Sequence, residues 1–329
     1  MDYQFLPKIE LHLHLDCSLS YKVVKQINPA ITYEEYRESF IAPPKCTDLV
    51  EYIARAIHGY ELMQTKEQLR WVTLDLFEQL KKDAVIYAEI RFAPLLHIAK
   101  GLTPEQVVQT VNDAATEGIQ LSGVQAGIIL CTLRHYTEEQ SMETVQLVQQ
   151  FGGTNVVAFD IAGDEAGNPV DNHKKSFAFA KANHIHCTAH AGEAKGPESV
   201  WETLQHFHPA RIGHGTRSAE DEQLLIYLKQ KDIHLEVCPT SNIQTNVFDT
   251  IENHSADRIY RSGVSMSVNC DARTVTPVTL TSEYELLEKI FGWTKEHFLN
   301  CNLEAIRHAF CSAQMKEALR KQIHTAYSN

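Results

Sequence analysis

The sequence predicts a closed (β/α)8 barrel (a TIM barrel) with a helical insertion after its first strand. Short apolar, β-branched segments recur eight times along the 329 residues, as the strands of a buried sheet do. One amphipathic stretch of helical length separates most of them, and strands that alternate with helices form right-handed βαβ units with a parallel sheet. Eight such units suit a barrel better than an open sheet, and no GxGxxG motif follows the first strand to favour a dinucleotide-binding fold.

The predicted elements follow one another in a regular order. The eight strands are expected at 9–14, 85–92, 124–131, 156–161, 185–190, 211–213, 234–238 and 264–269. Helices between them are expected, for example, at 103–117, 141–150, 197–205 and 219–229. Thr103 precedes a proline at the start of the first of these helices, and a proline in the first turn leaves the helix intact because no hydrogen bond is lost there.

The interval after the first strand departs from this order. It holds two predicted helices, at 46–63 and 66–82, in place of one. An insertion after a barrel strand lies at the C-terminal face, where the active sites of such barrels form. Residues from about 30 to 80 are therefore expected to form a lid or pocket wall over the site, with a purely structural excursion as the alternative. No repeat or linker marks a boundary, so residues 1–329 are expected to form a single domain.

Composition and charge exclude several classes of protein. Hydrophobic residues make up 43% and charged residues 22% of the chain, as in ordinary globular proteins. The 30 Lys and Arg residues against 42 Asp and Glu residues give a net charge of −12. That charge disfavours nucleic acids and anionic membranes as partners, and no apolar run approaches the length of a membrane span. A small molecule is therefore the expected partner, and the sequence leaves the oligomeric state open.

The cysteines and the N-terminus indicate a cytoplasmic protein. The eight cysteines are scattered without a CxxC pair, which is typical of free thiols in a reducing compartment. The first residues carry an acid at position 2 and lack the basic start and cleavage site of a signal peptide.

Three His-x-His pairs are candidates for a metal site. They are His12/His14, His184/His186 and His206/His208. On a strand, residues two apart point to the same face, and a divalent metal is one good partner for two buried imidazoles. Spacing alone does not choose among the pairs. His12 and His14 end a strand, and barrel chemistry gathers where strands end, so the other two pairs are expected to be structural or at the surface.

Three further polar clusters also follow predicted strands. They are His190-Ala-Gly-Glu193 after the fifth strand, Gly213-His214-Gly215 after the sixth and Asn269-Cys-Asp271 after the eighth. Each alone has a structural explanation, as a hydrogen-bonded core histidine, a helix N-terminal carboxylate or a turn former. Together with the first strand they meet at one rim, where three imidazoles and a carboxylate form a suitable ligand set for Zn²⁺. Glu193 and His214 then remain as proton-transfer groups.

Five motifs in order resemble the adenosine deaminase family of the amidohydrolase superfamily. They are KIELHLHLD at 8–16, DIAGDE at 160–165, HAGE at 190–193, RIGHG at 211–215 and SVNCD at 267–271, and YAEIRFAP at 87–94 fits the second strand. The resemblance implies zinc-dependent hydrolytic deamination. Adenosine, and with it 2′-deoxyadenosine, would be converted to inosine and ammonia when metal-bound hydroxide attacks purine C6.

The resemblance also implies roles for individual residues. One zinc ion per chain would be bound by His12, His14, His190 and Asp271. Glu193 would share a proton with purine N1, and His214 would orient and help deprotonate the attacking water. The substrate-binding residues would be His14, Asp16, which accepts from the ribose 5′-hydroxyl, and Gly163, whose N–H would reach purine N3.

Two positions depart from the family pattern. The family often has a second Asp after the metal-binding Asp, to hold purine N7, where this chain has Ala272 and then Arg273. Cys17 replaces the usual glycine after Asp16. Ala272 leaves open another aminopurine, such as adenine, as the substrate. A general metal-dependent amidohydrolase and an inactive binding barrel are further alternatives, whereas the segment that starts at Cys238 does not fit the P-C-x-x-C motif of the other zinc deaminases.

Overall fold

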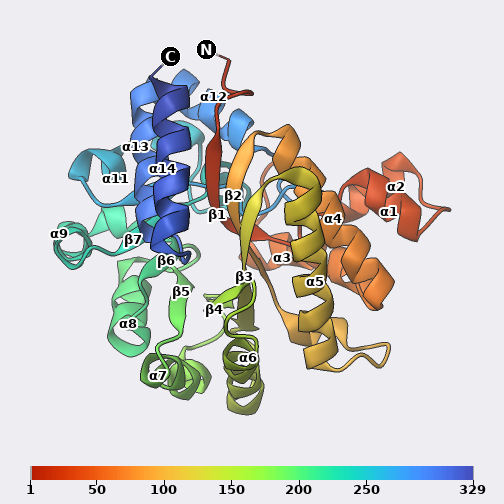
Figure 1. The fold of residues 1–329 in the computed structure, drawn as a ribbon. Helices are drawn as coiled ribbons and strands as arrows, with labels where there is room; N and C mark the ends of the chain where they lie inside the picture. Colours follow the sequence, from red (N-terminus) through yellow and green to blue (C-terminus); the bar gives the residue numbers. More distant parts are fainter. Residues whose placement is uncertain (1, 329) are drawn as a thin grey trace.

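Eight parallel strands form a nearly closed barrel in the computed structural model, which describes residues 2–328 (Figure 1). The strands are β1 (Lys8–His14), β2 (Val85–Phe92), β3 (Gln125–Leu133), β4 (Val156–Ala162), β5 (His186–Ala191), β6 (Arg211–His214), β7 (His234–Val237) and β8 (Met266–Val268). Each strand pairs with the next one along the chain. The predicted barrel and its eight strands are confirmed.

The barrel closes where the segment after β8 meets β1. Leu13 and Asp271 form an isolated parallel bridge. The His14 amide donates to the Asp271 carbonyl over 2.8 Å, and the Asp271 amide donates to the His12 carbonyl over 2.9 Å. Backbone pairing therefore brings three of the expected metal ligands together.

Helices cover the outside of the barrel (Figure 1). They are α1 (Tyr21–Ile27), α2 (Tyr33–Phe40), α3 (Leu49–Glu61), α4 (Lys66–Lys82), α5 (Pro104–Ser122), α6 (Glu138–Gln150), α7 (Lys174–Ala182), α8 (Pro197–Phe207), α9 (Glu222–Lys231), α10 (Pro239–Gln244), α11 (Ala256–Ser262), α12 (Leu280–Phe291), α13 (Lys295–His308) and α14 (Ala313–Tyr327). On β1, Leu11 and Leu13 join the hydrophobic core. His12 and His14 alternate with them and therefore point to the other face of the strand, into the barrel.

The insertion between β1 and β2 consists of α1 to α4, which project from one side of the barrel (Figure 1). Helices α3 and α4 were predicted, whereas α1 and α2 were not. Helix α3 lies against the loop after β1, because Gly59 has no side chain and a Cβ there would collide with the Asp16 carbonyl. Tyr52 of α3 reaches the segment after β8, where its hydroxyl lies 2.6 Å from Thr276 Oγ1. The insertion therefore contacts the C-terminal face of the barrel.

Capping side chains determine where the helices begin, which the hydrophobic periodicity of the sequence predicted only approximately. Thr103 caps α5 and forms a reciprocal pair of hydrogen bonds with Gln106, as its position before a proline predicts. A helix was expected from residue 219, but α9 begins after Asp221, whose side chain accepts from Gln223 N and Leu224 N. The residues before Asp221 form a short 3₁₀ turn instead.

Two further expectations concern the cysteines and the membrane. All eight cysteines are free thiols, as predicted, and six of them are buried. Among residues 2–328, no helix is both long and apolar enough to span a membrane.

Candidate active site and metal centre

The four expected metal ligands meet at the C-terminal end of the barrel. His14 Nε2 lies 3.1 Å from His190 Nε2 and 3.5 Å from Asp271 Oδ1. His12 Nε2 lies 3.4 Å from the same Asp271 oxygen. His12, His190 and Asp271 are buried, and the side chain of His14 is 14% exposed. Three imidazoles and a carboxylate thus converge on one point, as an N/O site for a divalent transition metal requires.

Buried carboxylates orient two of these imidazoles. His12 Nδ1 lies 2.7 Å from Glu236 Oε2, and His190 Nδ1 lies 3.2 Å from Asp160 Oδ1. A carboxylate accepts the ring N–H, so each Nε2 keeps its lone pair for the centre of the site. His12 Nε2 is buried and has no hydrogen-bond partner among residues 2–328. This free acceptor, beside the other two imidazoles, fits a bound metal ion.

Two buried arginines hold these carboxylates in their ionised form. Arg91 donates to Asp160 Oδ2 and Glu236 Oε2, each over 2.8 Å. Arg211 pairs with Glu236 Oε1 at 2.6 Å and with Glu89 Oε2 at 2.5 Å. Burial by itself would raise the pKa of Glu236, but the two guanidinium groups hold it well below its usual range. The network therefore presents fixed acceptors to the metal-facing histidines.

Glu193 and His214 lie beside the candidate ligands. His214 Nε2 is 3.5 Å from Glu193 Oε2. A group of ligand atoms from His12, His190, His214 and Asp271 lies within 4.8 Å of one another, so geometry alone also admits His214 as a ligand. Burial, and next the charge of Asp271, raise the pKa of the Glu193 carboxyl well above its usual value. His214 and Asp271 both have positive φ, 58° and 65°, a strained backbone that is common at functional positions.

Glu165 fixes the loop that carries Glu193. Its Oε2 accepts from the amides of Glu193, Ala194 and Lys195, over 3.0, 2.6 and 2.9 Å. Its Oε1 accepts from the Gly192 amide over 2.7 Å. A single carboxylate from the loop after β4 thus binds four consecutive amides of the loop after β5.

The expected substrate-binding residues lie at the same rim. Asp16 follows β1, and its Oδ1 lies 4.0 Å from His14 Nδ1. Burial raises the pKa of Asp16 to about 6. Gly163 follows β4 with φ of +99°, a conformation that favours glycine, and leaves its backbone partly exposed. A pocket of about 460 Å³ opens beside Glu193 and reaches Leu49 of α3.

Ala272 and Arg273 occupy different surroundings. Ala272 is 1% exposed and packs in a small apolar cluster with Leu49 and Tyr52 of the insertion. The Arg273 guanidinium points elsewhere and donates to Asp83 Oδ2 over 2.7 Å. Arg273 is therefore committed to a buried ion pair and does not replace a polar group at position 272.

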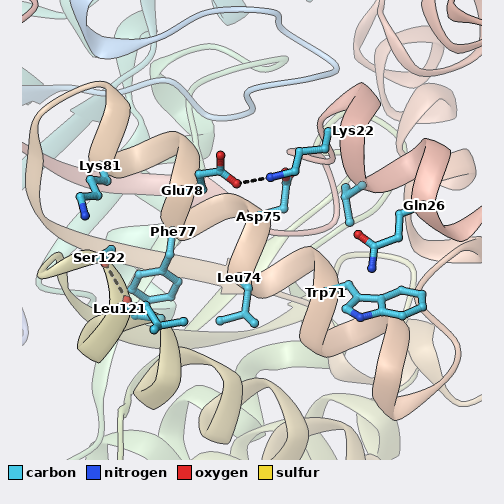
Figure 2. A pocket seen from close by; sticks show the side chains of 12 residues that line it. Lys22, Gln26, Trp71, Leu74, Asp75, Phe77, Glu78, Lys81, Leu121 and Ser122 are labelled. Atoms are coloured by element: carbon cyan, nitrogen blue, oxygen red, sulfur yellow. Dashed lines mark hydrogen bonds and ion pairs between the residues drawn. The ribbon is translucent and has the colours of Figure 1, made fainter.

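The other candidates lie outside this centre. His184, His186 and His208 are exposed and His206 is half-buried, which confirms the expectation for those two pairs. Figure 2 shows a separate pocket of about 360 Å³ between α1, α4 and α5, lined by residues such as Trp71, Phe77 and Leu121. The lining includes the Lys22–Glu78 ion pair but no candidate ligand.

Sequence reasoning missed several residues that support the site. They are Arg91, Glu165, Glu236, Asn242 and His254. A usable signal existed for two of them, because Arg91 and Glu236 are charged residues inside predicted buried strands, and a buried charge requires a partner. Asn242 and His254 carried no such signal, because both lie outside the strands and only the folded chain brings them close to the site.

Comparisons with known proteins cover nearly the whole chain. The sequence model of the family named Adenosine deaminase matches residues 7–326. An adenosine deaminase from Clostridium acetobutylicum is 35% identical over 325 residues, 97% of this chain and 97% of that protein. The crystal structure of adenine deaminase from Arthrobacter aurescens has a TM-score of 0.91 at 24% identity, covering 98% of this chain and 100% of that one. A zinc-bound amidohydrolase from Burkholderia ambifaria has a TM-score of 0.90 at 20% identity, covering 99% and 92%.

The family match spans every strand that carries a candidate ligand and the whole insertion. The two solved structures support the barrel fold. The curated relative carries the name of the family, and the match covers 97% of its length. The chain therefore belongs to the adenosine deaminase family and is a hydrolase that acts on carbon–nitrogen bonds.

Proposed function

We propose that the chain hydrolyses adenosine, and 2′-deoxyadenosine, to the corresponding inosine and ammonia with the help of one zinc ion. The observation that carries this proposal is the buried convergence of His12, His14, His190 and Asp271 beside Glu193 and His214. Family membership supports the same reaction, since the curated relative is named an adenosine deaminase.

Zinc is the metal we propose for the four converging ligands. When bound there, zinc would supply Lewis acidity that lowers the pKa of water to about 7. The zinc-bound Burkholderia amidohydrolase of similar fold is consistent with this choice. His12 and His190 offer Nε2 lone pairs because their Nδ1 atoms face Glu236 and Asp160. Ser241 donates to Asp271 Oδ2 over 2.7 Å and so orients this carboxylate as the fourth ligand.

Glu193 and His214 act on the substrate and the attacking water. A protonated Glu193 carboxyl can donate to purine N1, which draws electron density from C6 and favours addition there. Addition of water at C6, followed by loss of ammonia, converts the amine to the carbonyl of inosine. We propose that His214 orients the attacking water, since its Nε2 faces the same space as Glu193.

Asp16 favours a nucleoside over a nucleotide, and Gly163 can bind the purine ring. The Asp16 carboxylate can accept from a ribose 5′-hydroxyl, whereas a 5′-phosphate there would meet like charge. Gly163 can offer its N–H to purine N3 because the residue is partly exposed and has no side chain of its own. Adenine is the second candidate substrate, because Ala272 leaves the expected N7 contact open and a protein of similar fold is named an adenine deaminase.

An ultraviolet assay of the purified protein tests this proposal. Adenosine, 2′-deoxyadenosine, adenine and AMP are compared by kcat/KM, and the metal content is measured on the same sample. Adenosine and 2′-deoxyadenosine should be the best substrates, with about one zinc per chain. Faster turnover of adenine or AMP would contradict the nucleoside assignment, and full activity of metal-free protein would contradict the zinc assignment.

We also propose that residues 1–329 act as one domain in the cytoplasm. The ligands come from β1, β5 and the segment after β8, so the site needs strands from the first to the last of the barrel. Eight free thiols are consistent with a reducing compartment.

A further inference from the structure

A chain of three hydrogen bonds between buried residues ends at His214. The Ala256 amide donates to His254 Nδ1 over 3.0 Å. His254 Nε2 lies 3.2 Å from Asn242 Oδ1, and Asn242 Nδ2 lies 3.1 Å from His214 Nδ1. Asn242 is fully buried and His254 is 3% exposed.

The direction of each bond follows from its first member. A backbone N–H can only donate, so His254 Nδ1 is an acceptor and its ring proton lies on Nε2. Burial lowers the pKa of His254 to about 3, which agrees with a neutral ring. His254 therefore donates to Asn242 Oδ1, and the amide must present its Nδ2 hydrogens to His214 Nδ1. These hydrogen bonds fix the orientation of the Asn242 amide, and none of them involves a proposed metal ligand.

This orientation determines which nitrogen of His214 carries hydrogen. A proton on Nδ1 would face the Asn242 N–H across 3.1 Å as a second donor, so Nδ1 must keep its lone pair. A neutral imidazole then carries its hydrogen on Nε2, the atom that faces Glu193.

We propose that Asn242 and His254 are positioning residues that hold His214 as its Nε2–H tautomer. In this tautomer His214 donates a hydrogen bond to the reacting oxygen. It neither binds the metal nor takes a proton at Nε2, because that nitrogen has no free lone pair. The inference rests on the proposed function, and it narrows the role of His214 to orienting the water. It also separates His214 from His12 and His190, whose carboxylate partners leave Nε2 free.

The unmodified protein gives the first test. Long-range ¹H–¹⁵N correlation spectra of histidine-labelled protein report which ring nitrogen is protonated, and His214→Gln identifies the signal. We expect an unprotonated Nδ1 and a protonated Nε2 at His214, both as purified and with zinc added. A protonated Nδ1 overturns the proposal. The spectra report the tautomer whether or not the protein is active. Failure of the parent to deaminate adenosine would therefore refute the proposed function but not the proposed tautomer.

Substitutions give the second test. Asn242→Asp replaces the amide donor by an acceptor, so the tautomer of His214 should reverse. We expect kcat for adenosine to fall by about 10²-fold or more, with KM within a few-fold and metal content unchanged. His254→Gln keeps a donor for Asn242 Oδ1 and should retain more activity than His254→Leu. Equal kcat in the parent and Asn242→Asp overturns the proposal.

Asn112→Asp serves as the matched control. Asn112 is 7% exposed, lies on α5 and uses its Oδ1 to accept from the Asn155 amide, which an aspartate can also do. Its kcat should equal that of the parent. If Asn242→Asp does not fold, the His214 tautomer measured in the unmodified protein tests the proposal by itself.

Discussion

At the scale of single residues, Glu193 combines burial with a position beside His214. The residue is 5% exposed, and among the described residues His214 is the one basic side chain that forms an ion pair with its carboxyl group. Glu193→Gln keeps the size of the side chain but cannot exchange a proton with purine N1. We expect kcat for adenosine to fall by about 10²–10⁴-fold, measured by the ultraviolet assay.

Metal analysis of the same variant separates chemistry from folding. Glu193 lies outside the four proposed ligands, so Glu193→Gln should retain its zinc. Activity within a few-fold of the parent would remove Glu193 from the mechanism.

Ala272 leads to a prediction about recognition of purine N7. Its methyl group cannot form a hydrogen bond, and Arg273 is occupied by Asp83. The parent should therefore discriminate weakly between adenosine and 7-deazaadenosine, which lacks N7. Ala272→Asn adds an amide donor and should discriminate more, by roughly 2–12-fold in kcat/KM for a hydrogen bond of about 0.5–1.5 kcal/mol.

The comparison of both substrates in both proteins removes the intrinsic difference in ring reactivity. Equal discrimination in the parent and in Ala272→Asn would mean that another group, or a bridging water, already reads that edge of the purine.

At the scale of structural elements, the Glu165 contact joins the loop after β4 to the loop after β5. Glu165→Gln leaves one oxygen to accept from amides that now use both, and it turns an NH₂ group toward N–H donors. Because hydrogen bonds to a charged group contribute about 1.5–3 kcal/mol, we expect a loss of about 2 kcal/mol in unfolding free energy and a lower kcat. Amide exchange of residues 192–195 should accelerate.

Glu198 provides the control for this loop. It is exposed and accepts from the Gly196 amide only two residues away. Glu198→Gln should leave both kcat and the exchange of residues 192–195 unchanged, and an equal effect of both variants would deny Glu165 a specific role.

The elements also show what the sequence could predict. His12, His190 and Asp271 were predictable because they lie near or just beyond the C-terminal ends of β1, β5 and β8, and the C-terminal ends of parallel strands share one face. The hydrogen-bond chain to His214 was not predictable, because Asn242 and His254 approach each other only through the packing of α10 and the loop before α11. Likewise α1 and α2 were missed, since each is only about two turns long and gives too short a periodic pattern.

At the scale of the whole molecule, buried neutral histidines make stability depend on pH. His97 is fully buried, and burial lowers its pKa to about 4. Its pKa in the unfolded chain is about 6.5. Between these values the unfolded chain binds the extra proton, so the unfolding free energy decreases as the pH falls. The expected slope is about 1.4 kcal/mol per pH unit for this residue below pH 6.5, and no contribution above it.

Denaturant unfolding of the parent and His97→Gln at pH 7, 6 and 5 measures this slope. A glutamine can still donate to the Met63 carbonyl, which His97 Nδ1 contacts at 3.1 Å, but it does not titrate. The stability difference between the two proteins should shrink as the pH falls from 6.5. A constant difference would show that His97 is equally easy to protonate in both states.

The arginine–carboxylate network has a consequence for charge balance. The network includes Asp271 because the imidazole of His12 contacts that carboxylate as well as Glu236. It then contains two guanidinium groups and four carboxylates, which belong to Arg91, Arg211, Glu89, Asp160, Glu236 and Asp271. Their formal charges sum to minus two, inside a barrel where uncompensated charge is costly. A divalent cation brings that sum to zero. Protons can neutralise the same two negative charges. Protons and a divalent metal ion should therefore compete for binding inside the barrel, so that metal binding weakens as the pH falls.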